Sequence, residues 1–120
     1  MDEKPVILSD FLSYMETIKG KSKNTVNEYF YDLRTFLRFI KVHKNLVKID
    51  DPDDFDKIPI ADVDAELLES VTLSDLYAYM SYLSRERNNS ASARARKVAS
   101  LKSFFNYLCN KAALLKYNPA

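Results

Sequence analysis

The first half of the chain holds two runs of apolar residues at the three- and four-residue steps of an amphipathic helix. The first run predicts a helix with Ser9 as a possible N-cap and Gly20 as its stop, and its apolar stripe is Leu8, Phe11, Leu12, Met15 and Ile18. The second run predicts a longer helix, whose stripe is Val26, Tyr29, Phe30, Leu33, Phe36, Leu37 and Ile40. Ser22 or Asn24 can cap the free N–H groups at the start of this second helix.

A third helix is predicted to begin after Thr72. Thr72 is a suitable N-cap, because Asp75 follows it by three residues as in a variant of the capping box. The buried face of this helix is predicted to consist of Leu73, Leu76, Tyr77, Met80 and Leu83. Asn88 and Asn89 are expected to end it.

A fourth helix is predicted to begin at Ser90 or Ser92, either of which can cap it. Its core stripe is Val98, Leu101, Phe104, Phe105, Leu108 and Ala112. The Asn118-Pro119 pair is expected to stop this helix, since the residue before a proline avoids the helical conformation.

Few residues in this chain break regular structure, which favours helices over strands. The 120 residues include one glycine and four prolines, whereas an all-β fold needs many turns. The predicted fold class is therefore all-α, a bundle of four main helices in a single domain spanning residues 1–120. Between the second and third helices, the segment 48–71 is expected to form an acidic loop or a short helix. Phe55, Ile58 and Ile60 are expected to anchor it.

Charge is strongly segregated along the chain, although the net charge is only +1. Residues 50–69 hold nine acids against one base, a net charge of −8. Residues 19–48 carry +6 and residues 84–116 carry +7. The acidic run is typical of a solvated loop, and an acidic surface for a basic partner is the alternative.

The sequence offers no group of residues for catalysis or metal binding. The single histidine, His43, has no cysteine nearby, and one glycine excludes a Gly-rich phosphate loop. The lone Cys109 favours a packing role over a nucleophilic one and fits a reducing compartment. The start of the chain shows no secretory signal, and no apolar run is long enough to span a membrane. We therefore expect a soluble cytoplasmic protein with no cofactor, no metal and no membrane partner.

The faces of two helices that point away from the predicted core are rich in hydrogen-bond donors. On the second helix, one polar and mostly cationic stripe consists of Lys23, Asn27, Tyr31, Arg34, Arg38 and Lys41. On the fourth helix, the outer side carries Ser92, Arg96, Ala99, Ser100, Ser103 and Asn106, while Arg94 and Lys97 overhang the core edge. Such faces suit a phosphate backbone. The alternative interpretations of these two helix faces are an ordinary solvated face and a helix-packing seam.

Two blocks of this sequence resemble the N-terminal, SAM-like core-binding domain of tyrosine recombinases, the phage integrases of Xer type. The first block matches the family motif at Ser22, Asn24, Thr25, Tyr29, Asp32, Leu33 and Phe36. The second block has a basic pair at Arg96-Lys97, then Leu101-Lys102 and an aromatic pair at Phe104-Phe105. The closing Asn118-Pro119 is similar to the end of the family domain. The long acidic insertion departs from the shortest family members.

The resemblance implies that this domain and a separate catalytic domain clamp one recombination half-site of double-stranded DNA. It also implies other recombinase protomers as partners, in a tetrameric synapse of the full-length protein. The catalytic set and the nucleophilic tyrosine would lie in the catalytic domain, which this chain lacks. The candidate DNA-binding residues are Ser22, Lys23, Asn24, Thr25, Asn27 and Arg34 on the second helix, and Ser92, Arg94, Arg96, Lys97, Lys102 and Ser103 on the fourth.

Two rival functions stay open from the sequence. The first rival is a helical protein-interaction module whose acidic segment docks a basic partner. The second, a small helical enzyme domain, has little support because no reactive group of residues is visible. Salt dependence separates DNA binding from the interaction module, because contacts to phosphates weaken steeply as salt rises.

Overall fold

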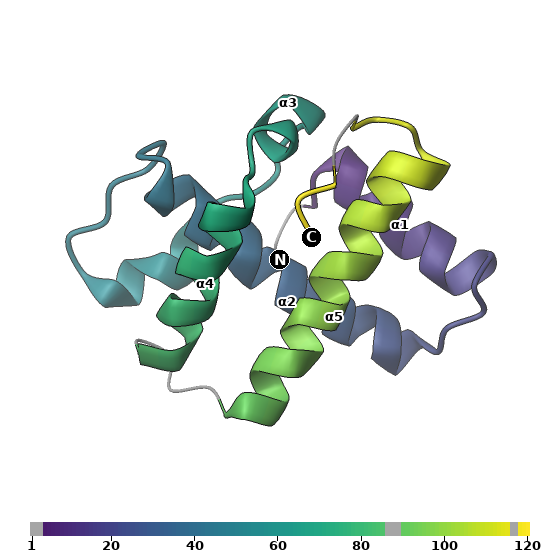
Figure 1. Ribbon diagram of the computed structural model, residues 1–120, viewed down its shortest axis with the longest axis horizontal. Helices are drawn as coiled ribbons and strands as arrows, with labels where there is room; N and C mark the ends of the chain where they lie inside the picture. Colours follow the sequence, from purple (N-terminus) through teal and green to yellow (C-terminus); the bar gives the residue numbers. More distant parts are fainter. Residues whose placement is uncertain (1–3, 86–89, 116–117) are drawn as a thin grey trace. The chain divides into compact units, whose positions relative to one another are not determined.

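The computed structural model describes residues 4–85, 90–115 and 118–120, and it is helical with no strand among these residues (Figure 1). The four main helices are α1 (Val6–Thr17), α2 (Lys23–His43), α4 (Leu73–Arg85) and α5 (Ala91–Asn106). Shorter turns of helix are η1 (Pro52–Lys57), α3 (Ala65–Glu69) and the π-helical η2 (Tyr107–Lys111). This confirms the all-α class, the four main helices and a short helix in the acidic segment.

The chain forms two compact units, residues 1–64 and residues 65–120, which are described one at a time. The first unit contains α1, α2 and η1, and the second contains α3, α4, α5 and η2. That residues 1–120 act as one domain stays a prediction.

In the first unit, α1 packs on α2. Its predicted stripe is buried from Leu8 to Met15, but Ile18 is 72% exposed because it lies at the C-cap, beyond the last helical turn. The proposed Ser9 cap is wrong, since α1 begins at Val6 after Pro5. Pro5 occupies the N-cap in an extended conformation, with ψ at 151°, and its side chain makes no capping hydrogen bond. Gly20 is confirmed as the stop, with φ at +66° just beyond the helix end.

The N-cap of α2 is Ser22, not Asn24, which lies within the first turn. The Ser22 Oγ accepts the Thr25 N–H at 3.2 Å. The α2 stripe is buried as predicted, except that Tyr29 is half-buried and meets the Phe11 ring edge-on at 6.1 Å between centroids. Phe39, which the stripe omitted, is also buried and stacks on His43 at 5.2 Å.

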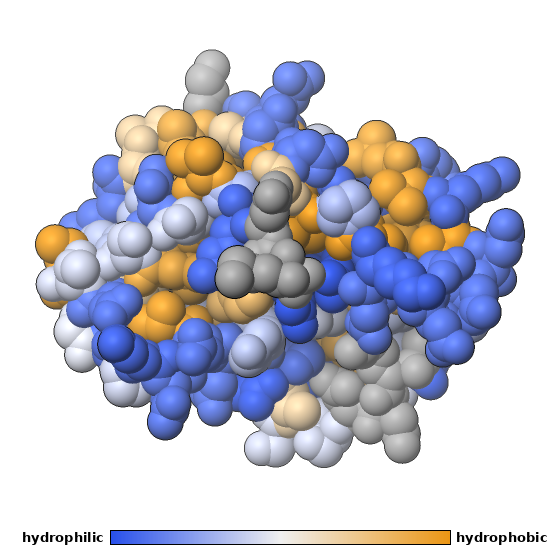
Figure 2. Space-filling view, turned by 180° about the vertical axis from the view of Figure 1, so that it is seen from behind, coloured by the Kyte–Doolittle hydropathy of each residue, from blue (hydrophilic) through white to orange (hydrophobic). Residues whose placement is uncertain are grey.

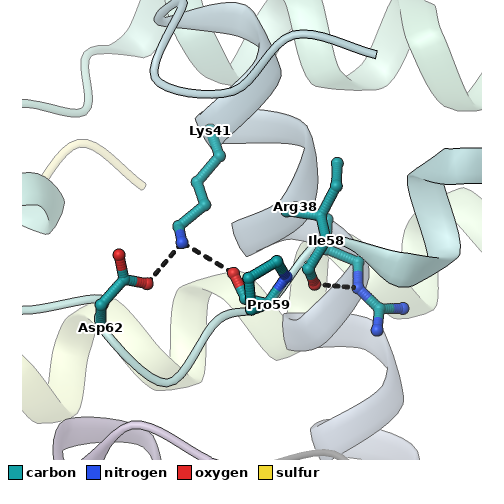
Figure 3. A network of polar contacts seen from close by, with 5 residues as sticks. All are labelled: Arg38, Lys41, Ile58, Pro59 and Asp62. Carbon is teal, nitrogen blue, oxygen red and sulfur yellow. Dashed lines mark hydrogen bonds and ion pairs between the residues drawn. The ribbon is translucent and has the colours of Figure 1, made fainter. Parts of the chain in front are cut away.

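The second half of the predicted cationic stripe on α2 does not face solvent. Arg38 and Lys41 are 5% and 4% exposed, which corrects the expectation that they point outward. The Arg38 Nε donates to the Ile58 carbonyl at 3.0 Å, and the Lys41 Nζ donates to the Pro59 carbonyl at 2.7 Å (Figure 3). Lys41 also pairs with the Asp62 carboxylate. These two cations therefore hold the acidic segment against α2.

The anchors predicted in the acidic segment are confirmed. Phe55, Ile58 and Ile60 are each at most 6% exposed, and Val63 joins them at 5%. The Asp51 carboxylate caps η1 by accepting the Asp53 N–H at 3.0 Å. The segment is thus acidic on its outside and apolar on its inside, because its carboxylates and its apolar side chains take opposite sides.

In the second unit, α4 has the predicted reciprocal cap. The Asp75 N–H donates to the Thr72 hydroxyl oxygen at 3.2 Å, and the Thr72 N–H donates to the Asp75 carboxylate at 2.9 Å. The predicted buried face is partly wrong, because Leu73 is 47% and Tyr77 is 65% exposed. Tyr79 is fully buried instead. Apolar residues cover a wider arc of α4 than its neighbours can bury.

The cap of α5 is Ser90, whose Oγ accepts the Ala93 N–H at 3.1 Å, and Ser92 lies within the first turn. The core stripe is confirmed, with Val98 and Ala112 half-buried. Ser100, expected on the outer side, is 1% exposed. Its hydroxyl is satisfied in this buried position because it donates back to the Arg96 carbonyl at 3.3 Å.

The predicted end of the fourth helix is wrong. Helical structure stops at Lys111, and Ala113 has a positive φ of 53°. The change to wider π-helical hydrogen bonding and the left-handed residue turn the chain before it reaches Asn118-Pro119. The expected end of the third helix at Asn88 and Asn89 lies outside the described residues.

Figure 2 shows one face of the molecule, on which hydrophobic and hydrophilic residues are mixed. The large apolar side chains with the highest exposure in the described part of the chain are Val6, Ile18, Tyr31, Leu46, Leu73, Tyr77 and Leu114. They belong to several elements, so exposed apolar surface is not confined to one helix.

Candidate nucleic-acid interface

The start of α2 presents capped but accessible donors. Ser22, Lys23, Asn24 and Asn27 are exposed, and Thr25 is half-buried. The Ser22 hydroxyl donates to the Thr25 Oγ1 at 3.0 Å while its oxygen accepts the Thr25 N–H. Ser22 is therefore committed to the cap, whereas the Thr25 hydroxyl keeps its own proton for an outside acceptor.

Arg34 lies farther along the same helix and is held by aromatic rings. Its guanidinium carbon is 5.3 Å from the Phe30 ring centroid and 5.0 Å from that of Tyr31. Tyr31 is 53% exposed, whereas Phe30 is buried. Stacking fixes the plane of a guanidinium while leaving N–H groups at its edge, a geometry that suits phosphate oxygens.

The second group of candidate residues lies along α5, from Ser92 in its first turn to Ser103. Ser92, Arg96 and Lys102 are exposed. Arg94, Lys97 and Ser103 are half-buried, which agrees with the expectation that Arg94 and Lys97 overhang the edge of the core. The bases thus begin in the first turn of the helix and continue along it.

Both helix starts lack a carboxylate. The first turns of α2 and α5 contain no acid, and neither does that of α1, whereas η1 has Asp53 and Asp54 there and α4 has Asp75. The N-terminus of a helix carries partial positive charge, so cations near it repel it. Lys23 and Arg94 add positive charge at such ends, and a bound anion would relieve this repulsion.

The structure places the predicted residues in two groups, one on each compact unit. Ser22, Lys23, Asn24, Thr25, Asn27 and Arg34 share α2 or its cap. The other group lies on α5.

Lys4 is a further cation near the candidate residues of α2, and the helical pattern does not select it. Its ammonium lies 4.9 Å from the Phe30 ring centroid, next to the start of α2 in space. A single lysine before Pro5 belongs to no helical period, so the pattern that identified Lys23 and Arg34 gave no signal for it.

The other chemistry of the described residues is limited. No group of three or more His, Cys, Asp or Glu side chains within 4–85, 90–115 and 118–120 could hold a metal ion. Burial raises the pKa of the Cys109 thiol, which makes its thiolate form scarcer. In that same part of the chain, no helix has the length and apolar character needed to cross a membrane.

Comparison with known proteins identifies relatives of the whole described fold. A family profile for the phage integrase N-terminal SAM-like domain matches residues 7–113. The chain is 53% identical over 115 residues to the tyrosine recombinase XerC of Caldanaerobacter subterraneus subsp. tengcongensis, covering 96% of this chain and 32% of that protein.

More distant relatives carry similar names. The chain is 32% identical over 102 residues to the tyrosine recombinase XerD of Listeria monocytogenes serotype 4b, covering 85% of this chain and 28% of that protein. It is 27% identical over 110 residues to a tyrosine recombinase XerC of Leptospira interrogans, covering 92% of this chain and 28% of that protein. The chain thus spans about a third of the length of these relatives or less. No solved structure matches it significantly.

Proposed function

Because the chain belongs to the family of phage integrase N-terminal SAM-like domains, we propose that it binds duplex DNA as the non-catalytic arm of a site-specific tyrosine recombinase. In this proposal the chain binds one recombination half-site, and a separate catalytic domain binds the same half-site. Further protomers of the full-length protein complete a tetrameric synapse, and the protein acts in the cytoplasm.

The observation that carries the proposal is the pair of capped, acid-free helix starts. Ser22 and Ser90 cap α2 and α5, and both helices continue into exposed or half-buried bases. Lys23 and Arg94, the bases nearest these two helix starts, oppose the helix dipole and cost stability, on the order of 0.3–1 kcal/mol each. A binding role for the phosphate backbone explains why the chain accepts this cost at two helix starts.

The candidate residues divide by role. Lys23, Arg34, Arg94, Arg96, Lys97 and Lys102 would neutralise phosphates, while Ser92, Thr25 and Ser103 would donate hydroxyl hydrogen bonds to them. Asn24 and Asn27 are exposed amides that could reach base edges in the major groove. Ser22 acts through the cap that holds the start of α2.

Binding of the 120-residue chain to a labelled duplex across a series of salt concentrations tests the proposal. Each neutralised phosphate contributes about −0.9 to the slope of log affinity against log salt. The Lys23→Ala/Arg96→Ala double variant should weaken binding and flatten the slope by about two phosphates' worth, with little change in melting temperature. If Asn27 reads a base edge, Asn27→Ala should relax base preference more than affinity.

A matched control is Lys48→Ala, which removes one exposed base in the segment that follows α2. It should leave the slope unchanged. If the Lys23/Arg96 double variant binds DNA as the unaltered chain does, Lys23 and Arg96 are ordinary solvated side chains. The alternative function, a helical protein-interaction module, is then favoured.

A further inference from the structure

A hollow of about 250 Å³ lies between α1 and α2 and includes two of the candidate DNA contacts, Lys23 and Asn27. Its apolar lining residues, Leu12, Val26 and Phe30, are each at most 9% exposed and form its floor. Its polar lining residues are exposed, so they form its rim. The hollow belongs entirely to the first unit.

The rim supplies charge and hydrogen-bond donors. Lys23 from α2 and Lys4 from the segment before α1 give it two ammonium groups. The Phe30 ring, 4.9 Å from the Lys4 Nζ, holds this ammonium over the hollow. Hydroxyls of Ser9 and Ser13 and the amide of Asn27 complete the set of donors.

One carboxylate, that of Glu16, also lines the hollow. Among the described residues it forms no ion pair within 4.0 Å, and neither does Lys23. Two ammonium groups against one carboxylate leave a charge of +1, which matches the single negative charge of a phosphodiester. A phosphate group is also small enough to sit on an apolar floor of three side chains while its oxygens reach the rim.

We propose that this hollow seats one backbone phosphodiester of the bound DNA, an inference that rests on the proposed function. Lys4 and Lys23 neutralise the phosphate, and Ser9, Ser13 and Asn27 donate hydrogen bonds to it. Glu16 lowers the affinity of the hollow for anions and biases it against doubly charged free phosphate. In this arrangement Asn27 contacts the sugar–phosphate backbone instead of a base edge, so Asn27→Ala should weaken DNA affinity without relaxing base preference.

Two variants outside the earlier set of candidate contacts test the inference in opposite directions. With a labelled duplex at low salt, Lys4→Ala should weaken binding about tenfold and flatten the salt slope by about 0.9. Glu16→Gln should strengthen binding, because it removes the negative charge and keeps the shape of the side chain. Lys48→Ala is the control for charge alone, because Lys48 is exposed, follows α2 in the chain and does not line the hollow.

The inference is overturned if Lys4→Ala and Glu16→Gln both bind DNA as the Lys48→Ala control does. If the Lys23/Arg96 double variant still weakens binding in that case, the proposed DNA binding stands and only the assignment of the hollow fails. If none of these variants changes DNA binding, the proposed contacts and the hollow fail together.

Titration with inorganic phosphate tests whether the hollow binds a phosphodiester of DNA or a free phosphate ion. In NMR spectra of the chain, the side-chain amide signal of Asn27 should shift strongly with a short duplex and only weakly with millimolar phosphate. Lys4→Ala should reduce the shift caused by the duplex. A strong, saturable shift with free phosphate, together with unchanged DNA binding of Lys4→Ala, would assign the hollow to a free anion and overturn the backbone contact.

Discussion

Lys41 holds the acidic segment on α2, and truncation of its side chain should measure how strongly. The Lys41 side chain is 5% exposed, and its ammonium binds the Pro59 carbonyl at 2.7 Å and the Asp62 carboxylate. Lys41→Ala leaves a part-buried carbonyl without its donor, at a cost of about 1–3 kcal/mol. The Asp62 side chain is 77% exposed, so solvent screens the ion pair and reduces its share to about 0.5 kcal/mol.

We therefore expect Lys41→Ala to lower the free energy of unfolding by about 2 kcal/mol, or the melting temperature by roughly 8 °C for a chain of this size. Circular dichroism during thermal and urea unfolding measures both. Lys48→Ala removes an exposed lysine and should stay within about 0.5 kcal/mol of the unaltered chain. If the two variants melt together, the buried lysine is not an anchor and the reasoning is refuted.

A double-mutant cycle with Asp62→Asn isolates the ion pair from the rest of the Lys41 contribution. A coupling energy of about 0.5 kcal/mol is expected between the two positions. A coupling near zero would show that the Pro59 carbonyl and packing account for the whole effect of Lys41.

The pH dependence of the same pair has a definite sign. The hydrogen bond from Lys41 holds the pKa of the Asp62 carboxyl below its ordinary value of 3.8. Because the pKa is lower in the folded chain than in the unfolded one, the stabilisation is present above about pH 4 and is lost as pH falls through the lower folded value. The difference in melting temperature between the unaltered chain and Asp62→Asn should thus be constant from about pH 7 to 5 and shrink as the pH falls below about 4. A difference that persists at the acid end would contradict the role of the carboxylate.

Three further predictions concern the other elements. Thr72→Ala removes one half of the reciprocal cap of α4 and should cost about 1 kcal/mol in urea unfolding, whereas Ser74→Ala, at an exposed position, should cost less. Shortening the acidic segment 50–69 while keeping its anchors should leave DNA affinity unchanged or raise it, because its carboxylates repel phosphates; a large loss with the fold intact would count against this. The 120-residue chain should not cut DNA in a strand-cleavage assay, and cleavage lost on mutation of one of its tyrosines would overturn this expectation.

The helices could be predicted from the sequence because their signals are local. Apolar spacing identified all four main helices, and Ser22, Ser90 and Thr72 cap three of them through hydrogen bonds to residues three positions away. Burial of α4 could not be predicted in the same way. Its apolar arc includes both Leu73 and Tyr79, and which of them is buried depends on how the helix is rotated against its neighbours rather than on its own period.

Periodicity alone also failed to separate the functional from the structural cations on α2. Arg34, Arg38 and Lys41 follow one another at helical steps, so periodicity assigns them one role. The structure divides them, because the carbonyls of Ile58 and Pro59 bind Arg38 and Lys41 from about twenty residues away, whereas Arg34 rests against Phe30 and Tyr31 on its own helix. A charged side chain satisfied by a distant backbone carbonyl has no local signature. On α2, the polar surface proposed for DNA therefore lies on the first half of the helix, from Lys23 to Arg34, while Arg38 and Lys41 of the second half hold the acidic segment.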